Sequence, residues 1–311
     1  MIMNMVVAGL LLLAPNPGGG GGGPDVQVRG GQDGNTARIS LKNSQIIISG
    51  NGRGGRSDGY RLKRPCWYEP AQNASDMLDF QQKSTRVDPG APQTRHEALE
   101  PFVEKLGEEG RWWTVAHDAS DPNGVSCQMA LDTYVFVPPN TTPPAGITMA
   151  QLADIARAAL TVPEPKVELN PDAKSYVNLP TWVWLGDVGE TTRSVTATLP
   201  GIMSATVTAT RGRIEIEPGT TDDRAKVEDS GCETGGTPYK EGAGEPTCGV
   251  TYLRASIDQP RGVYVLEVTA VWDIEAAGVG GEVPFAYDPV EVGGTRDVPV
   301  GEVQSTVRKT G

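Results

Sequence analysis

The chain has 311 residues, a net charge of −12 at pH 7, and 39 glycines and 25 prolines. Proteins that bind nucleic acid need cations to neutralise phosphates, so the acidic balance argues against that class of function. The length allows two ordinary domains, and the high glycine and proline content favours short strands joined by turns over a largely helical enzyme.

Residues 1–24 begin with a short apolar run, Met5 to Ala14. This run is too short to span a bilayer and matches the central region of a secretory signal. No basic residue precedes it, and the sequence LAPNPGGGGGG that follows is not a clean cleavage site. We predict an export signal or a short anchor with a glycine-rich linker, and we expect membrane contact only through this segment, if it is not cleaved.

Residues 25–64 carry eight basic and three acidic side chains, whereas residues 65–311 carry 19 basic and 36 acidic ones. The many glycines predict a flexible basic arm, in which ARISLKNSQIIISG (37–50) forms one or two short strands. Such an arm could contact anionic envelope polymers or lipid head groups, but a solvated arm is the simpler interpretation.

Residues 65–176 mix helical and extended patterns, which predicts an α+β module. TMAQLADIARAAL (148–160) is the clearest helix, because Thr148 and Gln151 form a capping box before an apolar face. RWWTVAH (111–117) and LDTYVFVPP (131–139) alternate like strands. TRHEALEPFVEKLGEEG (94–110) predicts a second helix, in spite of Pro101, because its apolar residues share one face: Leu99, Phe102, Val103 and Leu106.

Residues 177–311 alternate apolar and polar side chains, with turn signals every few residues, which predicts an all-β sandwich. In the longest of these segments, 262–276, alternate positions are expected to face the core: Tyr264, Leu266, Val268, Ala270 and Trp272. The other predicted strands lie in 193–201, 204–211, 212–219, 249–256, 289–294 and 300–309.

The four cysteines are Cys66, Cys127, Cys232 and Cys248. They form no C-x-x-C pair and the chain has only two histidines, so a zinc site is not expected. With an export signal, two disulfides are the economical interpretation, and free reactive thiols are the alternative. Three connectivities are possible. Pairing of nearest neighbours, Cys66 with Cys127 and Cys232 with Cys248, keeps each bridge within one predicted domain.

Four tryptophans are candidates for stacking on a ligand. Trp182 and Trp184, in VNLPTWVWLG (177–186), share one face of a predicted strand, whereas the consecutive Trp112 and Trp113 point to opposite faces. Two exposed indoles on one face would form a strip that stacks on carbohydrate or peptide. Burial in the core is the commoner arrangement, and we expect the rings of Trp182 and Trp184 to be buried.

The sequence contains no recognised catalytic, cofactor or metal site. HDASDPNG (117–124) has alanine where a calcium loop needs an oxygen ligand. Ser126, His117 and Asp118 lack a nucleophile elbow, and adjacent strand residues face opposite ways. A group of acids in 97–109 could supply a glycosidase acid and base, but it fits a solvated helix face better: Glu97, Glu100, Glu104, Glu108 and Glu109.

Three segments carry a resemblance to a known family: VNLPTWVWL (177–185), GTPYKEGAGEPTCGVTY (236–252) and PRGVYVLEVTAVWDIEAAGVGGE (260–282). Together with the series Cys248, Tyr252, Tyr264 and Trp272, they resemble a family of secreted actinobacterial proteins of unknown function, over roughly residues 65–285. The last part of those proteins is similar to a PKD-like, immunoglobulin-type sandwich. The resemblance therefore implies such a sandwich in 177–311, and it implies no catalytic residue.

These observations predict a secreted or cell-surface protein without enzymatic activity or a cofactor, acting in adhesion, display or assembly. Its expected partner is an envelope polymer or another extracellular protein, and not nucleic acid; the oligomeric state is left open. One alternative is a secreted hydrolase of cell wall or polysaccharide, using carboxylates in 90–125. The other is a carbohydrate-binding module that uses Trp182 and Trp184.

Overall fold

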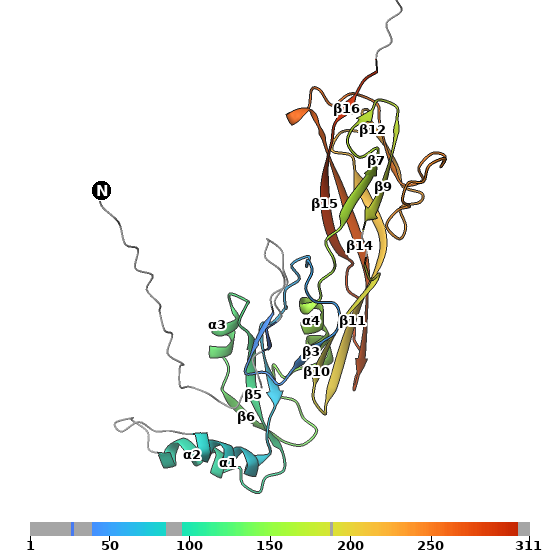
Figure 1. Ribbon diagram of the computed structural model, residues 1–311. Coiled ribbons are helices and arrows are strands. Elements are labelled where there is room, and N and C mark those ends of the chain that lie inside the picture. The colour runs from blue at the N-terminus through green and yellow to red at the C-terminus, as the bar shows by residue number, and fades with distance from the viewer. Residues whose placement is uncertain (1–25, 28–38, 85–94, 187–188, 304–311) are drawn as a thin grey trace, which may run out of the picture.

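The computed structural model describes residues 26–27, 39–84, 95–186 and 189–303. The predicted export signal and linker lie outside the described residues, as does most of the last predicted strand. The described chain is mostly β and contains several antiparallel sheets (Figure 1).

The first sheet has the strand order β1-β2-β5-β4, with β6 also paired to β5. Its strands are β1 (Val26–Gln27), β2 (Ser40–Lys42), β4 (Cys66–Pro70), β5 (Arg111–Asp118) and β6 (Tyr134–Val137). Helices α1 (Ala74–Ser84) and α2 (Arg95–Val103) lie between β4 and β5 in the chain, and α3 (Gly124–Met129) lies between β5 and β6. A small apolar cluster joins α1 and α2 to β5: Met77, Leu78, Phe102 and Trp112.

The predicted helix in 94–110 is shorter than expected, and its apolar face is only partly used. It ends at Val103, and of its four apolar residues Phe102 is buried, whereas Val103 and Leu106 are exposed. Two elements escaped prediction nearby, α1 and α3. Helix α3 has only six residues and the apolar residues of α1 form a narrow face, so periodicity gives both a weak signal.

The second sheet has five strands in the order β15-β14-β11-β10-β3. They are β3 (Ile47–Ser49), β10 (Thr192–Leu199), β11 (Met203–Glu217), β14 (Tyr264–Val279) and β15 (Val290–Val298). The predicted core face of β14 is confirmed, because Tyr264, Leu266, Val268, Ala270 and Trp272 are all buried.

The strands predicted in 204–211 and 212–219 form one long strand, β11. Its register with β14 shifts between Arg211 and Ile214, which marks a β-bulge. Gly212 lies in the bulge, where a Cβ would come within 2.7 Å of the Asp273 carboxylate. A glycine inside a strand is typical of a bulge, and here it bends the strand without ending it.

The third sheet has the order β12-β13-β9-β7, and a separate parallel pair, β16-β8, joins the last described strand to a strand from the middle of the chain. The strands of the third sheet are β7 (Lys166–Asn170), β9 (Pro180–Gly186), β12 (Ala225–Glu228) and β13 (Gly249–Tyr252). The pair consists of β8 (Ser175–Tyr176) and β16 (Val300–Gly301). In Figure 1, β7, β9 and β12 lie at the end of the molecule opposite α1 and α2.

Helix α4 (Met149–Ala159) is the predicted helix of 148–160, and it packs against β10, β11 and β14. The Thr148 hydroxyl accepts a hydrogen bond from the Gln151 N–H at 3.1 Å, as a helix cap does. The second half of the predicted capping box is absent, because the Gln151 side chain donates to the carbonyl of Arg64 instead, at 2.9 Å. This bond ties the segment before β4 to the helix.

The segment 37–50, for which one or two short strands are predicted, forms two, and they join different sheets. β2 pairs with β5, and β3 pairs with β10. Hydrogen bonding also crosses the predicted border at residues 176 and 177, because β7 pairs with β9. The division of the chain into domains therefore stays a prediction, whereas the apolar core continues from β4 through α4 into the second and third sheets.

Candidate functional site

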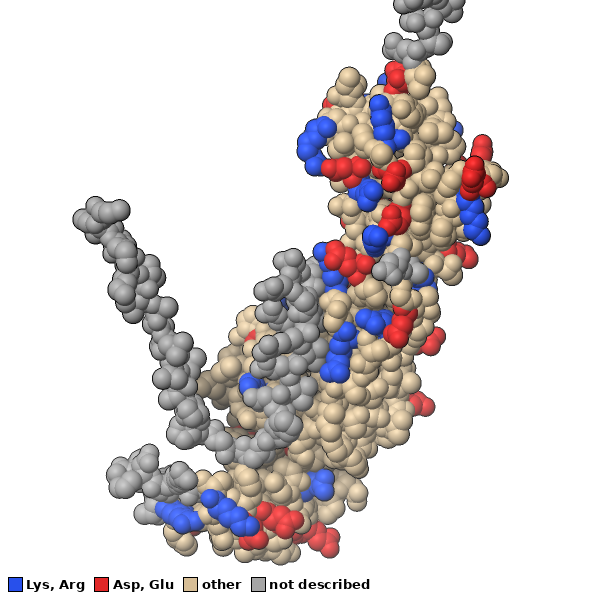
Figure 2. All heavy atoms as spheres, viewed as in Figure 1, with Lys and Arg blue, Asp and Glu red and all other residues tan. Residues whose placement is uncertain are grey.

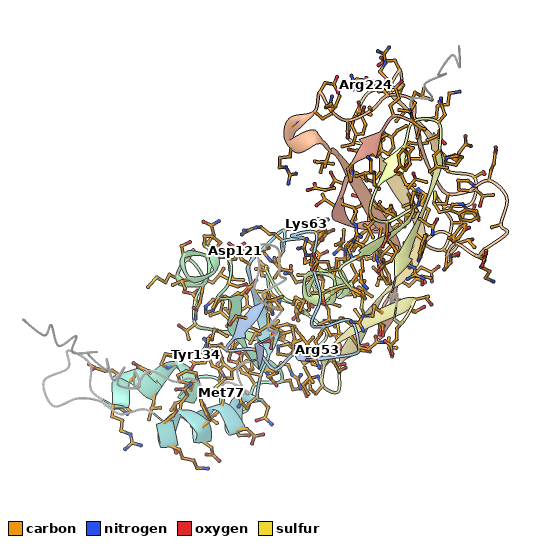
Figure 3. The ribbon with its side chains drawn as sticks, turned by 45° about the horizontal axis from the view of Figure 1, so that its top comes forward. Arg53, Lys63, Met77, Asp121, Tyr134 and Arg224 are labelled. Carbon is orange, nitrogen blue, oxygen red and sulfur yellow. A yellow bond between two sulfur atoms is a disulfide. The ribbon has the colours of Figure 1, made fainter. Side chains whose placement is uncertain are left out.

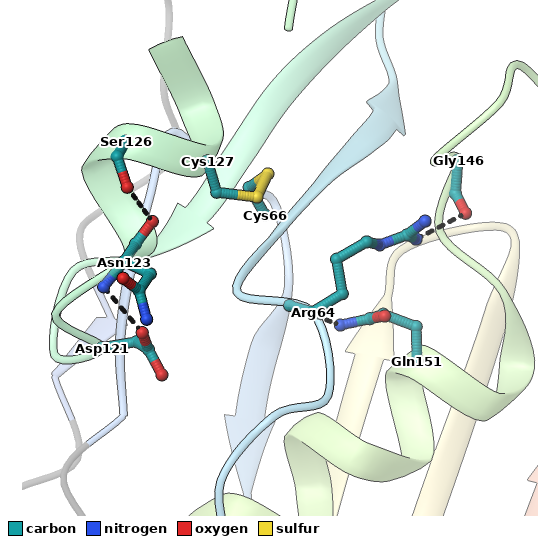
Figure 4. The surroundings of a disulfide bond; sticks show 8 residues. All are labelled: Arg64, Cys66, Asp121, Asn123, Ser126, Cys127, Gly146 and Gln151. Carbon is teal, nitrogen blue, oxygen red and sulfur yellow. Dashed lines mark hydrogen bonds between the residues drawn. A yellow bond between two sulfur atoms is a disulfide. The ribbon is translucent and has the colours of Figure 1, made fainter. Parts of the chain in front are cut away.

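Both predicted disulfides are confirmed. Cys66 in β4 is bonded to Cys127 in α3, and Cys232 is bonded to Cys248, next to β13. Figure 4 shows the first bridge beside the turn formed by Asp121 and Asn123. Disulfides persist in oxidising compartments, so two of them are compatible with an extracellular protein.

Two of the four candidate tryptophans cannot stack on an external ligand. Trp112 is 5% exposed and Trp113 is 7% exposed. Trp112 packs between Phe102, at a ring distance of 4.8 Å, and Phe136, at 5.4 Å. Helix α2 covers one side of β5 and the main core covers the other, so the alternation of the strand buries both indoles.

The expectation that Trp182 and Trp184 are buried is wrong. Both are half-buried, because the core side of β9 is taken by Thr181, Val183 and Leu185. The two indoles therefore share the outward side of the four-stranded sheet. The stacking hypothesis requires both rings on one solvent-facing side, and the structure places them there with part of each ring exposed.

A third ring, Tyr239, lies against Trp182 with ring centroids 5.8 Å apart and planes at 73°. Tyr239 belongs to the loop closed by the Cys232–Cys248 disulfide and is 38% exposed. We call Trp182, Trp184 and Tyr239 the aromatic face. Sequence reasoning missed Tyr239, because its position depends on how the disulfide loop folds back over β9.

The loop approaches β9 closely at a glycine. Gly235 accepts a backbone hydrogen bond from Leu185 at 2.8 Å. At Gly236, where φ is +75°, a Cβ would lie 2.6 Å from the carbonyl oxygen of Val183 and 3.1 Å from the Cα of Trp184. Only glycine fits this conformation and this contact, so Gly236 fixes the loop beside the two indoles.

Polar side chains border the aromatic face. In the sheet, Asn170 pairs with Trp182 and Glu168 pairs with Trp184 across β7. The Glu168 carboxylate lies 2.8 Å from Lys166 Nζ. On the other side of β9, Gly249 lies opposite Trp182 and adds no side chain to cover the ring. Half-exposed rings flanked by hydrogen-bonding groups suit a ligand that has both apolar faces and hydroxyl groups.

The residues considered for catalysis are not arranged for it. The Ser126 hydroxyl donates to the carbonyl of Asn123 at 3.0 Å, and Asp118 accepts from the backbone of Ser40 and from Ser120 (Figure 4 shows the Ser126 bond). His117 is buried, which lowers its pKa, and its Nδ1 has no hydrogen-bond partner among the described residues. These groups stabilise the turn between β5 and α3.

The acids around α2 are exposed on an open surface: Glu97, Glu100, Glu104, Glu108 and Glu109. This exposure fits the solvated helix face that the sequence favours, and Glu108 there pairs with Lys105. In the described ranges, no group of three or more His, Cys, Asp or Glu residues is placed to hold a metal ion. Each helix of the described chain is too short or too polar to span a membrane.

Comparison of the chain with protein-family models, curated proteins and solved structures finds no match.

Proposed function

We propose that the chain is a secreted or cell-surface, non-enzymatic protein that acts in adhesion or assembly by binding an envelope carbohydrate through its aromatic face. The observation that carries the proposal is the placement of Trp182 and Trp184. Two half-exposed indoles, two residues apart on one strand, present neighbouring ring surfaces with Tyr239 beside them.

Carbohydrate is the ligand class that this surface suits best. Sugar rings have apolar faces that pack on indoles and hydroxyl groups that hydrogen-bond at the edge. Asn170 and Glu168 lie beside the rings and offer such partners. Charged side chains of both signs are interspersed over the face of the molecule seen in Figure 2, which does not present the continuous basic surface that nucleic acid needs.

We further propose that the second and third sheets form an immunoglobulin- or PKD-like sandwich and that the chain belongs with the secreted actinobacterial proteins it resembles. The inner faces of both sheets contribute to one core, through Val183 and Leu185 from one sheet and Leu266 and Val268 from the other. The two disulfides and the apolar start of the chain support export.

The experiment that tests this function is sedimentation of the protein with insoluble polysaccharides: cellulose, chitin and purified bacterial cell wall. We expect the wild-type chain to pellet with at least one of them. Trp184→Ala should weaken binding about tenfold, because loss of one stacked ring removes 1–2 kcal/mol. Tyr176→Ala is the matched control, since Tyr176 is also an exposed aromatic residue but lies on β8, outside the aromatic face.

Two results would contradict the proposal. One is a wild-type protein that stays in solution with all three polysaccharides. The other is a Trp184→Ala protein that binds as tightly as the wild type. Circular dichroism of each variant confirms that a loss of binding is not a loss of folding.

A further inference from the structure

A cavity of about 460 Å³ lies where separate segments of the chain meet, away from the aromatic face. Its walls come from residues 63–64 before β4, from 142–146 between β6 and α4, from the first turn of α4, and from Phe285 between β14 and β15. This volume lies in the range of small-molecule sites. Figure 3 shows Lys63 at this junction, between the part of the chain with α3 and the long strands.

Two adjacent cations line the cavity. Lys63 Nζ lies 4.6 Å from the centre of the Phe285 ring. The Arg64 guanidinium extends along the wall and donates to the carbonyl of Gly146 at 3.4 Å (Figure 4). Both cations come from the basic segment 25–64 of an otherwise acidic chain.

Arg64 is charged and partly desolvated without an anion to balance it. Its Nε is buried and has no hydrogen-bond partner among the described residues, where Arg64 also makes no ion pair. Burial lowers the pKa of this guanidinium, which reflects the same cost of desolvation. Arg64 as a whole is half-buried, and pairing with an incoming anion would offset the cost of its partial desolvation.

The carboxylate in the cavity wall, Asp154, does not serve this purpose. Its Oδ1 accepts hydrogen bonds from the hydroxyls of Tyr60 at 2.7 Å and Tyr287 at 2.9 Å. Burial, followed by the effects of Asp154, raises the pKa of both tyrosines, so they remain donors. Asp154 keeps its negative charge in the cavity wall, but its Oδ1 is bound by two phenols and it makes no ion pair with Arg64 or Lys63.

We propose that this cavity binds one anionic group, a carboxylate or a phosphate, on a molecule whose apolar side packs against Phe285. The planar fork of Arg64 suits two oxygens of such a group, and Lys63 adds a second positive charge. Thr142 and Thr148 supply hydroxyl groups in the same wall. The proposal does not depend on the aromatic face, and a sugar acid or a sugar phosphate would each supply the chemistry.

Isothermal titration calorimetry of the full chain tests the proposal with three probes: glucuronate, inorganic phosphate and glucose. We expect glucuronate or phosphate to bind, with affinity that falls as salt is added, and glucose not to bind. Comparison of the two anions distinguishes a carboxylate site from a phosphate site. Arg64→Gln should weaken the binding about tenfold or more, as the loss of a charge-assisted pair does.

Matched variants make the test specific. Arg213→Gln is the control, since Arg213 is an exposed arginine on β11 paired with Glu215, away from the cavity. Lys63→Gln, a change at an exposed side chain, tests the site if Arg64→Gln does not fold, and it should weaken binding severalfold. Trp184→Ala should leave anion binding unchanged, which separates this site from the proposed function. Failure of both anions to bind, or unchanged binding in both Arg64→Gln and Lys63→Gln, would overturn the proposal.

Discussion

Glu69 is a fully buried carboxylate in β4 that three donors satisfy. Its oxygens accept from the Ser44 hydroxyl at 2.6 Å, from the Gln45 N–H at 2.6 Å and from the Trp67 indole at 2.8 Å. Burial raises the pKa of Glu69, and these hydrogen bonds oppose the rise. Nothing in the local sequence distinguishes this glutamate from the exposed ones of α2, so its role was visible only in the fold.

Ser44→Ala should lower the free energy of unfolding by about 1.5–3 kcal/mol, because a buried charge loses one donor. The variant should also raise the pKa of Glu69 further. A raised pKa in the folded state means that stability is lost as the pH rises through that value, so the deficit of the variant should be larger at neutral pH than in acid. Urea unfolding at both pH values measures this. Ser230→Ala, at an exposed serine, is the control, and an equal effect of the two substitutions would contradict the prediction.

At the same scale, the tryptophans show what strand alternation can and cannot predict. The period of two placed Trp182 and Trp184 on one face correctly, but it does not say which face is the core. Val183 and Leu185 lie on the opposite face of the strand, and they are the buried ones. Which face of β9 is buried depends on the segments that pack against each side of the strand. A single sequence does not contain this information.

At the scale of elements, each disulfide ties to the core a segment with few buried side chains of its own, helix α3 in one case and the loop 233–247 in the other. The Cys232–Cys248 bridge closes a loop with a sequence separation of 16, and the Cys66–Cys127 bridge one of 61. Only Cys232, Gly235, Pro246 and Cys248 are buried in the smaller loop. The bridge therefore keeps Tyr239 beside Trp182.

Replacement of Cys232 and Cys248 by alanine should lower the free energy of unfolding by about 3 kcal/mol, and replacement of Cys66 and Cys127 by about 4 kcal/mol, from the entropy of the unfolded loops. Chemical denaturation measures both. The first double variant should also shift the tryptophan fluorescence to longer wavelength, as Tyr239 leaves Trp182. Wild-type unfolding midpoints in both variants would show that the bridges do not stabilise the fold.

Some local sequence patterns predicted a helix or strand correctly and others did not. The cap and apolar face of α4 were sufficient to predict it, because both act within the helix. Helix α1 has a comparable start, where Asn73 accepts from the Asp76 N–H at 2.8 Å, but only a narrow apolar face follows. The break predicted in β11 at Gly212 was a bulge, and the partner strand β14 carries the sheet across it.

At the scale of the whole molecule, α4 connects the parts of the chain. Arg157, only 2% exposed, pairs with Asp58 and lies 4.8 Å from the Tyr60 ring, while Asp154 holds Tyr60 and Tyr287. These contacts join residues far apart in sequence. Composition and spacing were sufficient to predict the β-rich class and the two bridges. They did not predict these contacts of α4 or the cavity beside them, because both depend on tertiary packing.

Ionisation of the buried and half-buried tyrosines provides a test of this packing. Burial raises the pKa of Tyr60, Tyr68, Tyr252 and Tyr287 above the ordinary value. A raised pKa contributes stability below the unfolded value of about 10, and this stability is lost as the pH rises further. We therefore expect part of the tyrosinate absorbance to appear only in a cooperative step that coincides with loss of circular dichroism.

Two substitutions test whether the raised tyrosine pKa values around Asp154 contribute to this loss of stability. Tyr287→Phe removes one of the phenols that hold Asp154 and should shift the alkaline midpoint, because one proton fewer is released on unfolding. Tyr176→Phe, at an exposed phenol on β8, should leave the midpoint where it is in the wild type. If all tyrosines instead ionise while the circular dichroism stays native, the phenols at Asp154 are open to solvent and the junction is looser than its hydrogen bonds indicate.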